Sequence, residues 1–330
     1  MNSSVVAIIG AGQLGSRHLQ GVLKSQRPLK IFVVEPNAVS GKVAHSRAQE
    51  IDHAHDITFL ERIEELPRFL DFVIVATNSN VRFAVVQRLL VHSSVRYLVL
   101  EKVLFQLEAE YHATLTLIER HKVNCYVNHS RRMQVFYQLL KSELDSTPSD
   151  KVFFSAYGVN WGLGGNGLHF TDLICFLFDD QVRTYNTDHL DTKIIDSKRT
   201  GYVEFTGTLS GSTNKGIRFD IRSMPPDDHE FLPLSLVINT PLQRVFIQEG
   251  SITTVSNYRA DNDFKPVVTE HALLFQSDLS KILVENALVG KPLLLTTYQE
   301  SMLNHLAFTN ALREFYNTFN NTKQDRCLIT

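Results

Sequence analysis

Short apolar runs alternate with polar, helix-compatible stretches over the first 128 residues of the chain. The apolar runs predict strands at 5–9, 29–34, 57–60, 71–76, 95–100 and 123–127. The stretches between them predict helices at 38–50, 80–91 and 107–121. Strands that are apolar along most of their length are typical of a parallel sheet buried on both faces, and their alternation with helices indicates an α/β unit. We therefore expect a doubly wound parallel sheet in this part of the chain.

The second half of the chain changes character, because strand-like runs follow one another with turn clusters such as 227–229 between them. The predicted strands are 152–159, 183–194, 201–209, 215–222, 234–239 and 244–248. The predicted helices are 134–144, 168–178, 267–289 and 297–319. Since no regular helix separates most of these strands, their sheet should be largely antiparallel. We place the boundary near residue 128, which predicts two domains, 1–128 and 129–330.

Composition changes this picture mainly by excluding some classes of partner. The 330 residues are 43% hydrophobic, and 33 Lys and Arg stand against 35 Asp and Glu, for a formal charge of −2. The two signs are interspersed, so the chain lacks the basic stripe that indicates a nucleic-acid interface. It also lacks the run of about 20 apolar residues that crosses a bilayer. Neither nucleic acid nor a membrane is an expected partner.

The cysteines give no sign of a metal site. Cys125, Cys175 and Cys327 are scattered and lack metal-ligand spacing. We interpret them as buried or idle thiols in a reducing compartment, and no metal is expected. Because the N-terminus also lacks the basic leader of a signal peptide, we expect the protein to be cytoplasmic.

The first predicted strand ends in a glycine-rich turn of the form G-x-G-x-x-G, built from Gly10, Gly12 and Gly15. In a dinucleotide-binding turn the first glycine makes the tight bend and the second lets the backbone approach a pyrophosphate. The third glycine lets the helix lie close to the strand. The amides at the start of that helix have no partners within it, and they can face the phosphates. A tight turn that binds no nucleotide is the alternative.

An acidic residue at the end of the second strand strengthens the nucleotide interpretation. Glu35 follows the run 29–34, about 20 residues after the glycines, where such a carboxylate binds the ribose hydroxyls of the adenosine. The same carboxylate repels a 2′-phosphate, and no arginine follows it in Pro36, Asn37 and Ala38. The cofactor predicted from these residues is NAD rather than NADP.

Two further strands end in polar residues at the same expected crevice. Thr77 and Asn78 follow the run 71–76 and would pass the cofactor, although a helix N-cap at Asn78 or Ser79 fits the sequence equally well. Glu101 and Lys102 follow the run 95–100. A lysine there can relay a proton of a substrate hydroxyl if burial lowers its pKa. Taken alone, a solvated strand end is the common alternative.

A glycine-rich stretch between 159 and 172 leads into a predicted helix that starts at about residue 168. His169 and Asp172 would lie in its first turn, three residues apart and on neighbouring faces. An imidazole is suited to proton transfer near neutral pH. A capped helix start with an acidic first turn is an equally good interpretation.

Together these stretches resemble the glucose–fructose oxidoreductase and inositol dehydrogenase family (Gfo/Idh/MocA). The resemblance covers the glycine turn, the acidic end of the second strand, the Ala76-Thr77-Asn78 loop, Glu101-Lys102 where the family carries Glu-Lys-Pro, and the Gly-x-His-x-x-Asp stretch at 167–172. Residues 128–133 (Asn-His-Ser-Arg-Arg-Met) also look like the family's junction between domains. The resemblance implies an N-terminal Rossmann domain and a C-terminal α+β domain with a large, mostly antiparallel open sheet.

The resemblance also implies an activity, which is reversible hydride transfer between a nicotinamide and a carbon that bears a hydroxyl on a sugar, sugar nucleotide or cyclitol. It makes Lys102 the active-site lysine, His169 the acid/base or hydrogen-bonding histidine, and Asp172 a carboxylate that positions its neighbours. The residues expected to bind NAD are Gly10, Gly12, Gln13, Leu14, Gly15, Glu35, Thr77, Asn78, Glu101, Lys102 and Asn128. The residues expected to contact substrate are Lys102, Arg131, Asn160, Trp161, Asn166 and His169. A homodimer or homotetramer through the C-terminal sheet is also implied.

Two departures from the family pattern keep other functions open. Val103 replaces the proline that usually follows the lysine, and Gly165 stands where many members place an aspartate, four residues before His169. Asn160 or Asn166 could fill that space, but an amide does not accept a proton as a carboxylate does. The alternatives are therefore a non-catalytic NAD-binding sensor or assembly protein, or a reductase of a non-sugar substrate like the biliverdin-reductase-like relatives. Arg131 and Arg132 could bind an anionic group of the substrate, or form a solvent-facing pair.

Overall fold

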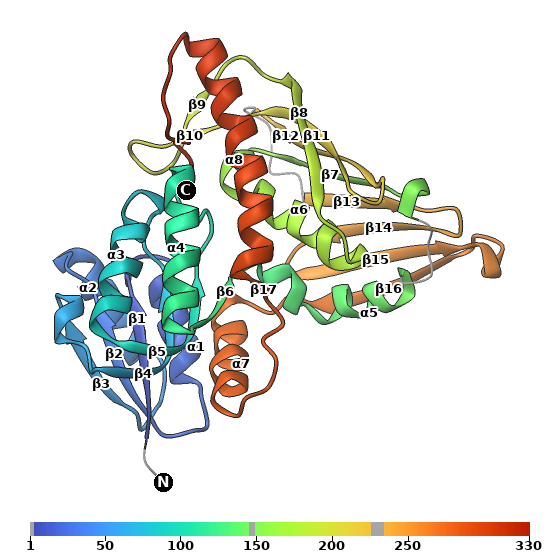
Figure 1. The fold of residues 1–330 in the computed structure, drawn as a ribbon. Coiled ribbons are helices and arrows are strands. Elements are labelled where there is room, and N and C mark those ends of the chain that lie inside the picture. The colour runs from blue at the N-terminus through green and yellow to red at the C-terminus, as the bar shows by residue number, and fades with distance from the viewer. Residues whose placement is uncertain (1–2, 145–148, 226–233) are drawn as a thin grey trace. The chain divides into compact units, whose positions relative to one another are not determined.

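The structure, a computed structural model, describes residues 3–144, 149–225 and 234–330. It divides into two compact units (Figure 1). Unit 1 comprises Met1–Ser130 and Leu274–Ser301, and unit 2 comprises Arg131–Leu273 and Met302–Thr330. The change from unit 1 to unit 2 after Ser130 lies close to the boundary expected near residue 128, and Leu274–Ser301 also belongs to unit 1. The turn expected at 227–229 lies outside the described residues.

Unit 1 is built on a sheet with the strand order β17-β6-β5-β4-β1-β2-β3. Its strands are β1 (Ser4–Ile9), β2 (Leu29–Val34), β3 (Asp56–Leu60), β4 (Phe69–Val75), β5 (Ser94–Leu100), β6 (Asn124–Val127) and β17 (Thr296–Thr297). All described pairs in this sheet are parallel except the short antiparallel pair of β17 with β6. The carboxyl-terminal parts of the central strands β1, β4 and β5 are buried, as their apolar sequences predict.

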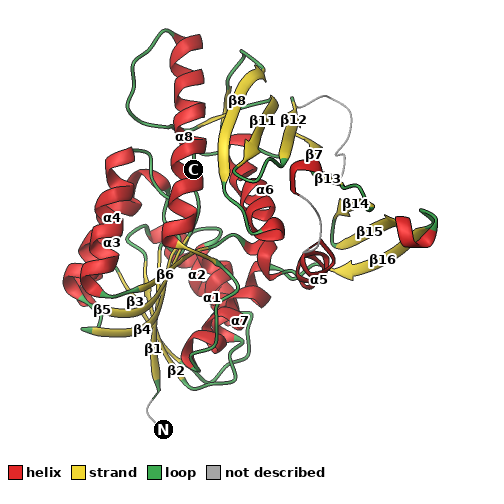
Figure 2. Cartoon of the chain, turned by 45° about the vertical axis from the view of Figure 1, so that its right-hand side comes forward, coloured by secondary structure: helices red, strands yellow, loops and turns green. Residues whose placement is uncertain are grey.

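The helices of unit 1 cover both faces of this sheet (Figure 2). They are α1 (Gly15–Leu23), α2 (Ala38–Gln49), α3 (Ser79–His92), α4 (Glu108–His121) and α7 (Gln276–Leu288). Helix α1 packs against α2 and α7, and α3 packs against α4. This two-sided arrangement of helices on a parallel sheet is the Rossmann topology expected from the sequence.

The register of the parallel strands brings their carboxyl ends to one edge. Val34, Ile9, Val75, Leu100 and Val127 are successive partners across the sheet. The residues that follow them therefore lie side by side at that edge, which we call the crevice edge. These residues are Glu35, Gly10, Ala76, Glu101 and Asn128, and the amide of each continues the hydrogen-bond ladder by one step. Ligands of open α/β sheets bind at this edge.

Unit 2 is built on a mostly antiparallel sheet with the strand order β16-β15-β14-β13-β7-β12-β11-β8. Its strands are β7 (Phe153–Val159), β8 (Val182–Leu190), β11 (Gly207–Thr213), β12 (Arg218–Met224), β13 (Leu234–Asn239), β14 (Gln243–Glu249), β15 (Ile252–Arg259) and β16 (Pro266–Ala272). Among the described strands of this sheet, only β7 and β12 pair in parallel. A separate two-stranded ladder joins β9 (Ile195–Asp196) to β10 (Val203–Glu204). The mostly antiparallel sheet expected for this half is confirmed.

The helices α5 (Val135–Leu144) and α6 (Leu163–Phe178) pack together, and α6 also packs against β12. Helix α8 (Tyr298–Asn320) follows β17 near the end of the chain. Two helix predictions are corrected here. The helix expected at 267–289 begins only at Gln276, because 266–272 pairs with β15 as an edge strand. The helix expected from 168 begins at Leu163, so the glycine-rich stretch is helical.

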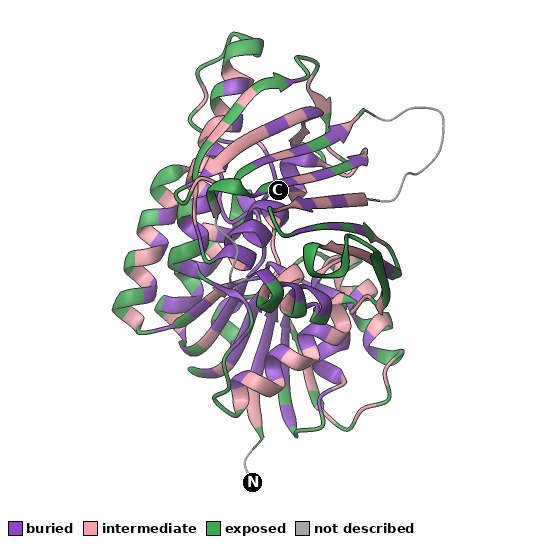
Figure 3. Ribbon diagram, turned by 90° about the vertical axis from the view of Figure 1, so that its right-hand side faces the viewer, coloured by how far each residue is buried: buried purple, intermediate pink, exposed green. Residues whose placement is uncertain are grey.

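One face of the unit 2 sheet is open, and buried and less buried residues alternate along its strands (Figure 3). The side chains exposed on alternate positions include Phe153, Tyr157 and Phe246. The homodimer or homotetramer expected through this sheet stays a prediction. Within the described ranges, no helix combines the length and apolar character that a membrane crossing requires.

Candidate functional site

The glycine turn at the crevice edge has the geometry that a pyrophosphate site requires. Gly10 has a φ of +83°, and a Cβ there would lie 2.8 Å from the methyl group of Thr77. A Cβ at Gly15 would lie 1.8 Å from the Gly10 carbonyl oxygen, so only glycine lets α1 pack this closely. A Cβ at Gly12 meets nothing within 4 Å. The turn is therefore tight on its protein side and open beside Gly12.

Glu35 is held over this turn by backbone amides. One carboxylate oxygen accepts a hydrogen bond from the Ala11 amide at 2.8 Å, and the other accepts one from the Asn37 amide at 2.9 Å. The Asn37 side chain in turn caps α2 through the amides of Val39 and Ser40. The carboxylate that sequence analysis assigned to the ribose hydroxyls thus lies beside the glycine turn, in a fixed orientation.

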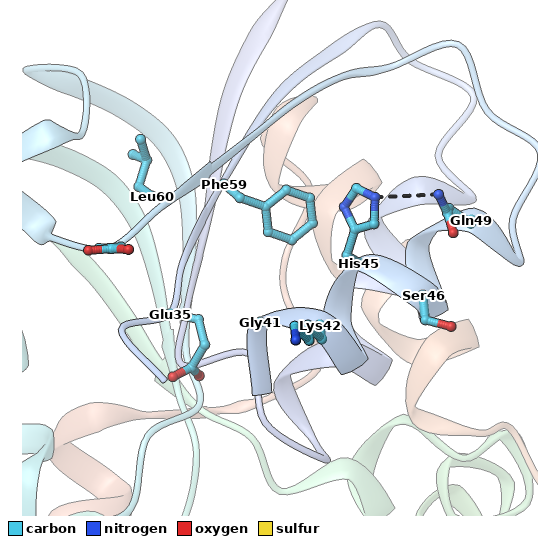
Figure 4. Close-up of a pocket in the computed structure, with 9 residues that line it drawn as sticks. Glu35, Gly41, Lys42, His45, Ser46, Gln49, Phe59 and Leu60 are labelled. Atoms are coloured by element: carbon cyan, nitrogen blue, oxygen red, sulfur yellow. Dashed lines mark hydrogen bonds between the residues drawn. The ribbon is translucent and has the colours of Figure 1, made fainter. Parts of the chain in front are cut away.

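A cavity of about 550 Å³ opens next to Glu35, between α2 and the end of β3 (Figure 4). The side chains of Lys42 and His45 line it from the helix, and the Phe59 ring lines it from the strand, with the His45 and Phe59 ring centroids 5.2 Å apart. Glu35 stands at one end of this cavity, so unit 1 leaves space beside the carboxylate as well as beside Gly12.

Arg47 of α2 is a candidate residue that the sequence analysis missed. Its guanidinium donates to the Gln13 carbonyl at 2.8 Å, to the Ser16 hydroxyl at 2.6 Å and to the Gln13 side chain at 2.8 Å. It therefore brings a positive charge to the N-terminal end of α1, which already carries positive partial charge. An anion bound at the glycine turn would be attracted by both the helix end and this arginine.

The loop after β4 carries Thr77 and Asn78. The Thr77 hydroxyl is buried and makes no hydrogen bond within the described residues. Asn78 occupies the N-cap position of α3, but its side chain makes no capping hydrogen bond and the residue is exposed. The N-cap interpretation of Asn78 therefore does not account for its side chain, and both residues offer polar groups at the crevice edge.

Arg82 ties this loop to the next one. The residue is 2% exposed, and its guanidinium donates to the backbone carbonyls of Thr77, Val103 and Leu104. The peptide bond between Lys102 and Val103 is cis, and Val103 is completely buried. Arg82 thus fixes the backbone of the loop after β4 and of the loop after β5. Its position in the sequence did not indicate this role.

Glu101 lies inside a buried polar cluster rather than in solvent. Its carboxylate accepts hydrogen bonds from His18 of α1 at 2.8 Å and from the Asn128 side chain, and it is 3% exposed. The other nitrogen of His18 lies 2.8 Å from the Ser280 hydroxyl of α7. Burial raises the pKa of Glu101, but the hydrogen bonds and charge of His18, together with Asn128, outweigh it and lower the pKa overall.

Because Glu101 is buried in this cluster, the interpretation of 101–102 as a solvated strand end is wrong for Glu101. Asn128 also donates to the Gln276 side chain at 3.0 Å, while its own carbonyl oxygen has no partner within the described residues. Glu101 and Asn128 therefore hold the ends of β5 and β6 together with α1 and α7. Lys102, the next residue, is half-buried at the crevice edge. The sequence analysis did not predict His18.

The candidate residues of unit 2 lie around the turn from β7 into α6. Asn160 and Gly162 both adopt the left-handed conformation, with φ values of +48° and +74°. The Trp161 indole donates to the Arg222 carbonyl at 2.8 Å, and the Asn166 side chain donates to the Trp161 carbonyl at 2.7 Å. The turn is therefore closed by its own polar groups, and Asn160 is the exposed residue in it.

Both arginines at the start of unit 2 are paired with carboxylates. Arg132 makes two hydrogen bonds, of 2.7 and 2.9 Å, to Asp172, which is 2% exposed. Arg131 makes two, of 2.9 and 2.6 Å, to Glu249. The solvent-facing pair weighed in the sequence analysis is therefore wrong, and the guanidinium groups stabilise unit 2. Asp172 orients Arg132 and α6, in keeping with a positioning role.

His169 lies on α6, two turns into the helix rather than in its first turn, and is half-buried. The amides of Gly164 and Gly165 at the start of this helix donate to the Glu204 carboxylate, at 2.8 and 3.0 Å. Lys102 belongs to unit 1 and His169 to unit 2.

The cysteines are free and buried, and burial raises the pKa of both Cys175 and Cys327 to about 12. Thiols of this kind are unreactive near neutral pH, as expected. Over the ranges that the structure describes, no group of three or more His, Cys, Asp or Glu residues could hold a metal ion.

Comparisons with known proteins match this architecture. UDP-N-acetylglucosamine 3-dehydrogenase from Acidithiobacillus ferrooxidans shares the fold with a TM-score of 0.70 and 13% identity, and the match covers 97% of this chain and 99% of that one. Scyllo-inositol dehydrogenase from Lactobacillus casei, with bound NAD(H) and scyllo-inositol, has a TM-score of 0.69 and 14% identity, with 97% of this chain and 98% of that one covered. The transcriptional regulator Gal80p from Kluyveromyces lactis has a TM-score of 0.71 and 14% identity, with 96% of this chain and 90% of that one covered. At these identities the likeness shows the fold alone. No curated protein sequence matches the chain.

The sequence itself matches one family model, described as "Oxidoreductase family, NAD-binding Rossmann fold" (GFO_IDH_MocA), over residues 5–129. This segment contains the glycine turn, Glu35, Lys102 and Asn128. Over residues 5–129 the sequence is thus similar to the NAD-binding Rossmann domain of the Gfo/Idh/MocA oxidoreductases, which confirms the resemblance for this segment.

Proposed function

We propose that the protein is an NAD-dependent oxidoreductase that acts on a carbon bearing a hydroxyl in a sugar, sugar nucleotide or cyclitol. The observation that carries the proposal is the crevice edge of unit 1, where the turn is closed around Gly10 and Gly15 but open beside Gly12. The dehydrogenases of a sugar nucleotide and of a cyclitol among the solved structures of this fold support the substrate class.

The residues of the crevice edge fit a dinucleotide. The amides at the start of α1, backed by Arg47, would bind the pyrophosphate, and Glu35 would accept hydrogen bonds from the ribose hydroxyls. The side-chain oxygens of Thr77 and Asn128, which have no hydrogen-bond partner in the described part of the chain, would supply further polar contacts together with Asn78. The nicotinamide of bound NAD would supply the hydride chemistry.

We assign the proton chemistry to Lys102 and His169. Lys102 lies just beyond the buried carboxyl-terminal end of β5 and is itself half-buried, so its ammonium can hydrogen-bond a substrate hydroxyl and relay its proton. His169 is the proposed acid/base group of unit 2, because an imidazole is suited to proton transfer near neutral pH. Asn160 and Trp161 are proposed substrate contacts, and Asp172 positions α6. We propose no anion recognition by Arg131, because its guanidinium is paired with the carboxylate of Glu249.

The test is a screen for NADH formation with NAD⁺ and a panel of sugar nucleotides, sugars and cyclitols, alongside NAD⁺ binding by calorimetry. The matched variant is Gly12→Val. Since a Cβ at Gly12 meets no atom of the described residues within 4 Å, this variant should fold as stably as the wild type. It should nevertheless lose NAD⁺ binding and turnover, because the added side chain fills the space beside the turn. NAD⁺ binding that survives this substitution would contradict the assigned cofactor site.

A non-catalytic NAD-binding protein is the second candidate function. Gly165 favours it, because the helix that carries His169 lacks a carboxylate of its own one turn earlier, and a transcriptional regulator shares the fold. This candidate predicts NAD⁺ binding without NADH formation on any member of the panel. A reductase of a non-sugar substrate would show the same result on sugars but would oxidise NADH with another acceptor.

The preference for NAD over NADP depends on Glu35, and we expect Glu35→Ser to weaken it. A hydrogen bond to a charged group is worth about 1.5–3 kcal/mol, or roughly 10- to 100-fold in affinity, so the ratio of NADP to NAD dissociation constants should fall by about that factor. The ratio is the right measure, because loss of the bond to the Ala11 amide weakens both cofactors. Glu61→Ser, in the same cavity, is the control and should leave the ratio unchanged.

A further inference from the structure

We propose that Glu204 is a positioning residue for His169, and that its carboxylate takes the space which a side chain at position 165 would occupy. Glu204 is separated from Gly165 by 39 positions in the sequence and comes from the short strand β10. The inference rests on the proposed function, because it concerns the turnover in which His169 takes part.

The carboxylate of Glu204 caps the start of α6. It accepts hydrogen bonds from the Gly164 amide at 2.8 Å and from the Gly165 amide at 3.0 Å. The helix does not cap itself, since its N-cap residue is Gly162 and makes no side-chain cap bond. A negative charge is favoured at this end of a helix, so Glu204 stabilises the turns that lead to His169.

Three glycines make room for this carboxylate. A Cβ placed on Gly162, Gly164 or Gly165 would lie 3.0, 3.0 or 2.8 Å from an oxygen of Glu204. Glycine within a helix costs about 1 kcal/mol relative to alanine, so this run of glycines weakens the helix by itself. The space that it leaves is used by Glu204, which accounts for the presence of glycines in the first turns of α6.

Position 165 lies on the same face of α6 as His169, because the two are four residues apart. Helical side chains also lean toward the N-terminus of their helix, so a side chain at 169 extends over the turn that contains 165. A carboxylate fixed at Gly165 therefore lies one helical turn from His169. Glu204 supplies this carboxylate from strand β10, because α6 has no acidic residue of its own at this position.

The backbone around Glu204 is anchored on both sides. Its neighbours Tyr202 and Phe205 are buried, at 6% and 2% exposure, and Phe205 packs edge-on against Phe315 of α8. The Val203 amide donates to the Leu328 carbonyl at 2.8 Å. Glu204 is thus held between buried aromatic residues, which restricts where its carboxylate can go.

The test moves the carboxylate from position 204 to position 165. Glu204→Ala and Gly165→Asp are made singly and together, and the melting temperature, kcat and KM of each are measured. Each single variant should melt below the wild type, since the first loses the cap and the second crowds two carboxylates. Misplacement of a group near the chemistry can cost about 100-fold in rate, so kcat of Glu204→Ala should fall by up to that factor with little change in KM.

The double variant should recover, because an aspartate in the first turn of α6 restores both the cap and the charge. Gly165→Asp should therefore lower the melting temperature in the wild type and raise it in the Glu204→Ala background, and kcat should rise toward the wild-type value. Asp196→Ala, on the paired strand β9, is the control and should change neither quantity.

Additive changes in melting temperature would overturn the inference, since the two positions would then not share one space. Recovery of the melting temperature without recovery of kcat would also overturn it, because Glu204 would then be only a helix cap. A wild-type protein without turnover on the whole panel is a different result. It would refute the proposed function, and the positioning role would fall with it.

Discussion

Lys102→Met should abolish NADH formation while NAD⁺ still binds. General acid–base groups contribute about 10²- to 10⁴-fold to rate, so kcat should fall by that factor. Methionine keeps the length of the side chain but cannot hydrogen-bond or relay the hydroxyl proton. NAD⁺ affinity should change little, because the expected cofactor contacts are made mainly by the glycine turn and Glu35. The measurements are turnover on the best substrate of the screen and calorimetry with NAD⁺.

Lys102→Arg separates proton transfer from charge. Arginine keeps the positive charge but does not release a proton at accessible pH, so this variant should be almost as slow as Lys102→Met. Lys265→Met is the matched control, because the Lys265 side chain is 73% exposed and far along the chain from the motifs. Full activity in Lys102→Met would refute the role of this lysine, and full activity in Lys102→Arg would reduce it to a fixed charge.

Features that depend on neighbours in the chain could be predicted from the sequence. Gly10 and Gly15 follow directly from the need for a tight turn and close helix packing, and the distances in the structure agree. Glu35 was predicted because it ends the strand beside the turn. The strands of unit 1 could also be predicted, because burial on both faces of a sheet requires apolar residues along most of each strand.

Residues that act across the chain could not be predicted. His18 and Glu101 are 83 positions apart, and Arg82 reaches carbonyls 21 and 22 positions away. Their partners are fixed only when the sheet register brings separate strand ends to one edge. The glycine-rich start of α6 was predicted as a loop for the same reason, since the carboxylate that allows a helix there comes from Glu204. Strand β16 escaped prediction because its pairing with β15, rather than its own pattern, decides its structure.

The buried pair of His18 and Glu101 lies in the core of unit 1, and we expect Glu101→Ala to cost about 3–5 kcal/mol at neutral pH. The carboxylate is 3% exposed, and its loss leaves the buried His18 nitrogen and the Asn128 amide without their acceptor. In a unit of this size that loss should lower the melting temperature by about 10 °C. Glu119→Ala, at an exposed position of α4, should change it by less than about 0.5 kcal/mol.

The pH dependence of this loss follows from the lowered pKa of Glu101. Burial raises that pKa, but the hydrogen bonds and charge of His18 outweigh it, so the folded protein holds this carboxylate ionised below its ordinary pKa of 4.5. The unfolded state then binds a proton that the folded state does not, and the stability contributed by Glu101 decreases as the pH falls below that value. The difference in unfolding free energy between wild type and Glu101→Ala should therefore narrow as the pH falls below 4.5. Denaturant unfolding at several pH values measures this difference directly. If it did not narrow in acid, the ionised carboxylate would not be what holds the ends of β5 and β6 against α1.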